Sequence, residues 1–317
     1  MKNIENCEIL NVKFKCKKFD DHKELINYIN NKLLKIGTDK KSKYYFRGFS
    51  KVEQLYCSLI RKFENECLND NFCENHEIGM LQKLEQNGGL YFNNLNNVFD
   101  FVSTAQHFGL PTRMIDWTTN PFTALLFAVF MNPNPEDGVY RLIYIPSNKH
   151  IVLHDLPTNR ELDERELYVE KGYAMKFLSM IKCIEDIYIN PESGKELIKS
   201  VYRNTNPKFY NKNNNIDHYI ENSLNKFKDK KILFVTPNFV NERIAAQQGL
   251  FQFPYSLDKY DILKQLAETS TIIEIDKSLR CKIIETLEKM GHNIYQLMPD
   301  LANMCSAILT KEIIKIG

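Results

Sequence analysis

The strongest strand signal in this sequence is VYRLIYI, residues Val139–Ile145. Its β-branched and aromatic side chains suit a central or half-buried strand of a sheet. The turn-forming cluster NPNPEDG precedes it at residues 132–138. Before that turn, residues 120–131 carry a helical, largely apolar pattern. The sequence therefore predicts a helix, a turn and a buried strand in succession.

Strand and helix signals mix on both sides of this unit without a regular alternation. The first 40 or so residues predict a strand followed by a helix that Asp20 or Asp21 caps. Further predictions are a short strand at 44–46 that ends at Arg47 and Gly48, a mainly helical region at 53–130, strands at 232–235 and 271–275, and a helix at 279–290 that Gly291 ends. This order favours an α+β fold: one domain with a mixed or antiparallel sheet and a large helical part.

Length and composition limit the classes of protein. A chain of 317 residues is one large domain or two ordinary ones. With 43% hydrophobic and 26% charged residues it is globular and not largely disordered. With a net charge of +2, the surface cannot be basic throughout. The sequence still allows a local basic groove. We divide the chain into a lead-in at 1–42 and a domain at 43–317, with a polar insertion at 203–231.

Membrane and metal sites are not expected. The longest apolar run, Phe122–Met131, is half of the roughly 20 residues that a membrane helix needs. The first residues lack the apolar core of a secretion signal, and the eight cysteines form no CxxC pair, so we expect a cytoplasmic protein with reduced thiols. The loose spacings of Cys67, Cys73 and His76, and of His150 and His154, do not make a compact metal-ligand set.

The densest group of chemically capable side chains is TAQHFGLPTRMIDWTTNP, residues Thr104–Pro121. It holds a histidine, an arginine, an aspartate and the only tryptophan: His107, Arg113, Asp116 and Trp117. A glycine and a proline within it predict a turn between two helical stretches, a place where binding residues are often found. The alternative is a structural corner, with Arg113 paired to Asp116 and Trp117 in the core.

Two further segments carry weaker signals. Phe46-Arg47-Gly48 places an arginine at the end of a strand, where it can make bidentate phosphate contacts, and a glycine that would let a ligand approach the backbone. The alternative is a surface arginine. Residues Asn241–Phe251 place polar side chains beside a glycine after a strand, and alone this segment is a solvated turn.

Together the three segments resemble the FRG domain family, which is named for its Phe-Arg-Gly tripeptide. The resemblance rests on Phe46–Gly48, on Ala105–Thr118 with the following Asn-Pro and alanine-rich helix, on Arg243–Phe251, and on the ending at Met298–Leu301. It spans about residues 43–309. The middle motif is the longest and the most specific.

The resemblance implies a nucleotide-related function. FRG domains are distantly similar to ADP-ribosyltransferases of the arginine–serine–glutamate type, in which an arginine at the end of the first strand holds the phosphates of NAD. It implies that Arg47 takes this role and that residues 107–118 line the nicotinamide side. The expected function is an ADP-ribosyltransferase-like enzyme or an NAD glycohydrolase, of the kind found among bacterial toxins and anti-phage effectors. NAD is then a substrate, and ADP-ribose passes to a macromolecular acceptor that the sequence does not identify.

The predicted site combines reacting and binding residues. Four residues are predicted to be catalytic: Arg47, His107, Asp116 and Gln247. Seven are predicted to bind the nucleotide: Phe46, Gly48, Gln106, Thr112, Arg113, Trp117 and Arg243. In these roles Arg113 adds a second phosphate contact or pairs with Asp116, and Trp117 stacks on the nicotinamide or the adenine.

One departure from the enzyme pattern keeps other functions open. The ADP-ribosyltransferases use a glutamate here, and its nearest match by order along this chain is Gln247 or Gln248. An amide stabilises a developing positive charge less than a carboxylate does. Either Asp116 or Glu242 supplies the anion, or catalysis is weak or absent. The alternatives are a nucleotide-binding module without turnover, and a nuclease or RNA-binding protein that uses the basic residues 226–231.

Overall fold

The computed structural model describes residues 4–35, 44–64, 70–92, 98–130, 150–152, 232–235, 242–298 and 301–316, with parts of 132–146 and of 172–184. The predicted insertion at 203–231, with its basic end, lies outside these residues. Among the described helices, none combines the length and the apolar character that a membrane crossing requires.

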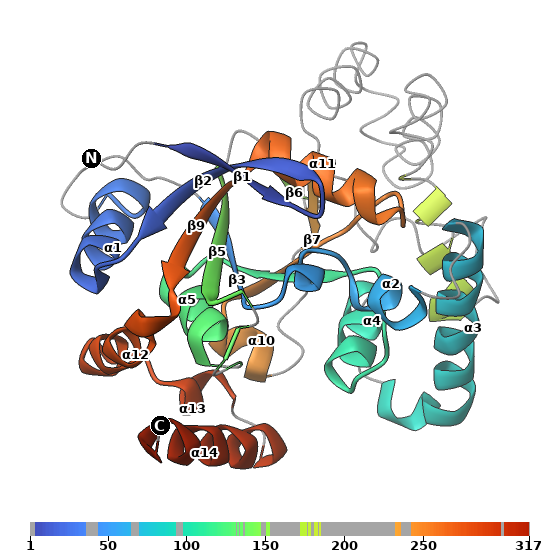
Figure 1. Cartoon of the computed structure of the whole chain (residues 1–317). Helices are drawn as coiled ribbons and strands as arrows, with labels where there is room; N and C mark the ends of the chain where they lie inside the picture. The colour runs from blue at the N-terminus through green and yellow to red at the C-terminus, as the bar shows by residue number, and fades with distance from the viewer. Residues whose placement is uncertain are drawn as a thin grey trace, which may run out of the picture.

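The described strands form one mixed sheet of nine strands, in the order β1-β2-β9-β5-β3-β4-β8-β7-β6 (Figure 1). Two neighbouring pairs, β2–β9 and β6–β7, are parallel, and the remaining pairs are antiparallel. The strands are β1 (Glu5–Ile9), β2 (Val12–Phe19), β3 (Tyr44–Phe49), β4 (Ile115–Thr118), β5 (Val139–Pro146), β6 (His150–Val152), β7 (Ile232–Val235), β8 (Gly249–Gln252) and β9 (Thr271–Asp276). The predicted α+β class with a mixed sheet is confirmed.

Strand β5 is the central strand that its sequence predicts. It pairs over six residues with β3 on one side and over six with β9 on the other. Tyr140, Leu142 and Tyr144 face one core of the protein, and Ile143 and Ile145 face another. Because both faces are covered, the apolar and aromatic residues of this strand run almost without a break.

The sheet is nearly interrupted between β3 and β4. One residue pair, Phe46 with Thr118, joins these two strands, whereas β4 and β8 pair over four residues. The sheet therefore consists of a first segment, β1-β2-β9-β5-β3, and a second segment, β4-β8-β7-β6. The candidate site lies at this junction.

Helices cover both faces of the sheet (Figure 1). Helices α1, α5, α12 and α13 pack against one face of the first segment, and α2 and α11 contribute to the core on the other face. Helices α3 and α4 pack with β7 and β8 of the second segment. The bounds are α1 (His22–Tyr28), α2 (Ser58–Phe63), α3 (Asp70–Gly88), α4 (Val98–His107), α5 (Pro121–Phe130), α10 (Glu242–Ala246), α11 (Lys259–Thr269), α12 (Arg280–Lys289), α13 (Ile294–Leu297) and α14 (Leu301–Ile316). Short helical turns lie at Ile29–Leu33, Val52–Leu55, Gly89–Phe92 and Lys277–Leu279.

Several predicted helix ends are confirmed by their caps. The Asp21 carboxylate accepts a hydrogen bond from the Glu24 backbone N–H at 2.8 Å, which starts α1. Helix α12 ends before Gly291, whose φ of +85° lies in the left-handed region that glycine favours. Helix α5 starts after Asn120, whose side-chain oxygen accepts from the Phe122 N–H at 3.0 Å.

Three predictions about strands were wrong. The first strand is a hairpin of β1 and β2, and β3 continues through Arg47 to Phe49, so this arginine lies within the strand and not at its end. The predicted helical region at 53–130 is interrupted by β4. The residues after Pro111 carry a local turn signal, although they form this strand. Both β4 and β8 have four residues, and their extended form depends on pairing with each other.

Gly48 has a different role from the predicted one. A Cβ atom at this position would lie 1.7 Å from the carbonyl oxygen of Ala124 and 2.8 Å from the backbone nitrogen of Ala128. The glycine therefore lets the backbone of α5 lie directly against β3. In the direction of an added Cβ atom, the space over Gly48 that we expected a ligand to occupy is filled by this helix, while Gly48 also borders a cavity described below.

Candidate functional site

Two cavities adjoin at the junction between β3 and β4. Cavity A, of about 280 Å³, is lined by residues of β3, α4, β4, α5, α10 and β8, together with Gln54, Gln247 and Met298. Cavity B, of about 460 Å³, is lined by Arg47, by residues 56–58 and 61–62 and by residues 109–111 and 114–116. Arg47, Gln106 and Asp116 line both cavities. These three side chains therefore form the shared wall of a two-part cleft.

Most of the predicted site residues converge on cavity A. Nine of the eleven line it: Phe46, Arg47, Gly48, Gln106, His107, Asp116, Trp117, Arg243 and Gln247. They come from three separate stretches of the chain: β3, the neighbouring elements α4 and β4, and the α10 region. The two others, Thr112 and Arg113, do not line either cavity.

Arg47 is anchored at two of its three guanidinium nitrogens. Its Nε donates to the backbone oxygen of Gln54 at 3.1 Å, and its Nη1 donates to the backbone oxygen of Asp116. The same Nη1 lies 3.9 Å from the Asp116 carboxylate. Within the described part of the chain, no hydrogen-bond acceptor engages Nη2. One edge of the guanidinium is thus held while the other stays open to a ligand.

The positive charge of Arg47 is only partly compensated. The pKa of Arg47 is lowered to about 10, chiefly by burial; the Asp116 carboxylate raises it and the Arg61 guanidinium lowers it, and the value includes both effects. The side chain remains protonated at neutral pH. A half-buried cation whose pKa lies below its ordinary value gains stability from an additional anion.

Arg113 shows the opposite balance. Its side chain is fully buried, its Nε lies 2.7 Å from Glu77, and its Nη2 lies 3.4 Å from Glu74. Burial alone would lower the pKa of Arg113, but the two carboxylates outweigh it and the pKa is raised. The predicted phosphate contact and the alternative pairing with Asp116 are therefore both wrong, because the structure satisfies this charge internally.

Asp116 is the carboxylate that faces the cleft. Its side chain is 67% exposed, and its Oδ1 accepts from the Gln106 amide at 2.9 Å. The Gln106 carbonyl in turn accepts from the Thr112 hydroxyl at 2.5 Å. Thr112 is buried and cannot touch a ligand, which corrects its predicted binding role. It positions the carboxylate through Gln106.

Trp117 belongs to the core, as the alternative interpretation has it. Its indole N–H donates to the Gln252 side chain at 3.0 Å, and its ring packs edge-on against Phe234. Because residues alternate along β4, the Trp117 ring lies on the other side of the strand from the Asp116 side chain, although Trp117 also borders cavity A. With 3% of Trp117 exposed, the ring cannot stack on a ligand, so the predicted stacking is wrong.

The other predicted residues of the site, Gln247, His107 and Glu242, differ in their surroundings. The Gln247 amide nitrogen donates to the backbone oxygen of Leu297 at 2.8 Å, which fixes the side chain and leaves its carbonyl oxygen for another partner. His107 lies at the end of α4 with its ring edge-on to Phe108. Glu242, the other acid considered as the anion, is exposed and lines neither cavity.

Sequence reasoning missed the acids that pair with Arg113 and the cations of cavity B. Glu74 and Glu77 are three residues apart on α3, a spacing that places both on one helix face. Arg61 and Lys62 at the end of α2 line cavity B and add positive charge to it.

The prediction that all cysteines are reduced is wrong for Cys73, which is disulfide-bonded.

Comparison with known proteins gives one family. No curated protein and no solved structure matches this chain. Residues 42–137 match the family model of the FRG domain. The matched residues include β3, α4 and β4, and with them Arg47, Gln106, His107 and Asp116, whereas Arg243 and Gln247 lie beyond the match. The similarity to the FRG domain therefore covers residues 42–137 of the chain.

Proposed function

We propose that this chain binds NAD, or a closely related nucleotide, in the cleft and transfers its ADP-ribose group to a macromolecule or to water. The observation that carries the proposal is the incompletely compensated Arg47 cation beside an exposed carboxylate on the shared wall of two cavities. A pyrophosphate supplies the anion that this guanidinium lacks.

The size and charge of the cleft fit a dinucleotide. Small-molecule sites have volumes of roughly 300–1,000 Å³, and cavity B alone lies in this range while cavity A adds to it. Arg47 lies on the wall that the two cavities share, and in this proposal it holds the phosphates that join the two nucleoside halves. Arg61 and Lys62 increase the attraction for anions on the side of cavity B.

The reaction needs a negative charge near the anomeric carbon. The bond between the nicotinamide nitrogen and C1′ of the ribose breaks, and nicotinamide leaves with the electron pair. An acceptor oxygen or nitrogen then bonds to C1′ and gives up its proton, for which His107 on the cavity wall is the candidate base. Asp116, which Gln106 orients, is the candidate anion that stabilises the developing positive charge. The carbonyl oxygen of Gln247 would accept from a ribose hydroxyl.

The cellular setting follows from the resemblance and not from the cleft. We infer a cytoplasmic protein, since NAD and macromolecular acceptors are both present there. The role of a toxin or an anti-phage effector is the corresponding expectation for a bacterial protein of this kind.

The test measures turnover and binding separately. Nicotinamide release from NAD is followed by proton NMR, and NAD binding by calorimetry. Arg47→Ala should weaken NAD binding by about 10- to 100-fold, since a charge-assisted hydrogen bond contributes roughly 1.5–3 kcal/mol. Asp116→Asn should keep binding and lower release by about 100-fold or more. Lys289→Ala is the control: it removes one positive charge from an exposed site on α12 and should change neither.

Other outcomes select the alternatives. Binding without release would make the chain a nucleotide-binding module, which the absence of a carboxylate at Gln247 favours. If NAD neither binds nor reacts, the proposal is wrong. An RNA affinity that falls steeply with salt would then support a nucleic-acid-binding protein.

A further inference from the structure

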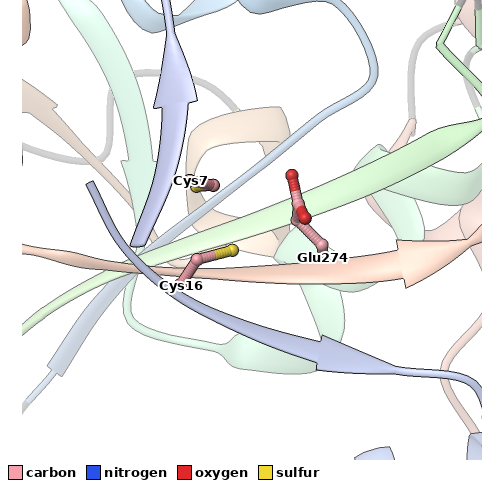
Figure 2. A group of neighbouring side chains, drawn as sticks. All are labelled: Cys7, Cys16 and Glu274. Atoms are coloured by element: carbon pink, nitrogen blue, oxygen red, sulfur yellow. The ribbon is translucent and has the colours of Figure 1, made fainter. Parts of the chain in front are cut away.

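Three potential metal ligands meet on one face of the sheet (Figure 2), and none of them lines the cleft. The sulfur of Cys7 on β1, the sulfur of Cys16 on β2 and a carboxylate oxygen of Glu274 on β9 all lie within 4.8 Å of one another. Both thiols are free. Glu274 lies more than 250 residues after the two cysteines, so the local spacing rules that made us expect no metal could not have found the group.

The strand register explains why the three side chains share a face. Cys7 pairs with Phe14, which is two residues before Cys16, and Cys16 pairs with Ile272, which is two residues before Glu274. Because side chains alternate along a strand, each step of two residues keeps the same face. The backbone of three adjacent strands therefore holds the donors together.

The charges around the group suit an anionic ligand set. The Glu274 carboxylate lies 3.3 Å from Arg141 at Oε1 and 3.6 Å from Lys18 at Oε2. Arg141 is also paired with Asp137 at 2.6 Å. Two thiolates and one carboxylate around a divalent cation leave one net negative charge, which the neighbouring Lys18 and Arg141 stabilise.

We propose that Cys7, Cys16 and Glu274 bind one thiophilic divalent cation, such as zinc, with a water molecule as the fourth ligand. Thiolate donors favour zinc, whereas magnesium and calcium prefer sites made of oxygen alone. A tetrahedral zinc ion with bonds of about 2.3 Å to sulfur and about 2.0 Å to oxygen needs its donors roughly 3.5–3.8 Å apart. Side-chain movements of about 1 Å therefore complete the geometry.

Metal binding here is a ligand exchange without a redox step. Two metal–sulfur bonds and one metal–oxygen bond form, water leaves the aqueous ion, and the protons of the two thiols pass to solvent. Water can reach the fourth position because Cys7 is only half-buried and β1 lies at the edge of the sheet. The bound metal would tie this edge strand to β9 across β2.

Cobalt(II) is the probe, added with air excluded to the metal-free chain and without a reductant, so that the disulfide of Cys73 stays intact. We expect one equivalent to give the sulfur-to-cobalt charge-transfer band and the visible bands of a tetrahedral site, and zinc to displace it. Cys7→Ser should abolish these bands with little risk to folding, because the residue lies on an edge strand. Glu274→Gln should weaken binding by about tenfold or more. Cys281→Ser, which changes an exposed thiol on α12, should leave the spectrum unchanged.

The proposal is overturned if cobalt gives no charge-transfer band, or if the band persists in Cys7→Ser. A band that disappears in Cys281→Ser would also overturn it, because it would assign the metal to surface thiols. Circular dichroism of each variant confirms that it is folded. The buried Cys16→Ser change serves as a second test where its spectrum matches the wild type.

Discussion

At the scale of single residues, two arginines of the matched domain divide into a structural cation and a candidate ligand-binding cation. Arg113 is enclosed by Glu74 and Glu77, whereas Arg47 has one partly exposed acidic neighbour. Their opposite pKa directions express this difference in compensation. The sequence alone does not distinguish the roles of the two arginines, because the acids that compensate Arg113 lie more than 30 positions earlier in the chain.

The Arg113–Glu77 pair gives a prediction about stability. Glu77→Ala leaves a buried guanidinium without its main partner, and we expect the free energy of unfolding to fall by about 3–5 kcal/mol. Urea unfolding followed by circular dichroism measures it. The control is Glu285→Ala, which breaks an exposed ion pair on α12 and should cost less than about 1 kcal/mol. Equal losses in both variants would show that the buried pair is not a special element of the fold.

At the scale of secondary-structure elements, β3 and α5 pack directly against each other, and residues of both line cavity A. Small residues make this contact: Gly48 on the strand, and Ala124 and Ala128 on the helix. Two residues of the Phe46-Arg47-Gly48 tripeptide therefore have unrelated roles. Its arginine faces the cleft, and its glycine serves the packing of a helix.

Gly48→Ala should therefore destabilise the protein without touching a ligand. The added methyl group would meet backbone atoms of α5 that cannot rotate away, and we expect a loss of about 3 kcal/mol or more. Gly79→Ala in α3 is a matched control, since nothing lies within 4 Å of the added Cβ atom. That change should stabilise the helix by about 0.5–1 kcal/mol. Thermal unfolding of both variants checks the prediction, and an unchanged melting temperature for Gly48→Ala would contradict it.

Local signals predict the elements that carry their own pattern. Strand β5 has a run of β-branched and aromatic residues, and α12 has a helical stripe with a glycine stop, so both are readable from sequence. Strands β4 and β8 are four residues long and owe their form to each other, so a local pattern does not reveal them. The meeting of Arg47, Asp116 and Gln247 was predicted through the family resemblance. Their hydrogen-bond partners were not, because these depend on the tertiary fold.

At the scale of the whole molecule, the sheet behaves as two segments joined at a short ladder. Strand β5 is paired over six residues on each side, whereas β4 is joined to β3 through one residue pair. The stability of a region follows from its pairing and burial. We expect the first segment to form the more stable part of the sheet.

Hydrogen exchange under native conditions checks this difference. Amides of β4 should exchange faster than those of β5 and β9, because opening the β3–β4 junction breaks few hydrogen bonds. Mass spectrometry of peptides from these strands resolves the rates. Uniform protection across the nine strands would instead show that the sheet opens as one unit.

Arg47 also bridges this junction, since it lies on β3 and donates to the backbone oxygen of Asp116 on β4. This bridge has a consequence for how relatives of this chain diverge. A descendant that has lost the proposed reaction is still expected to retain the arginine, because losing it would loosen the sheet. The Asp116 side chain contributes less to the structure of the sheet, since β4 pairs with β8 through its backbone. An acid at position 116, and not the arginine of the family tripeptide, is therefore the residue by which active and inactive lineages should be told apart.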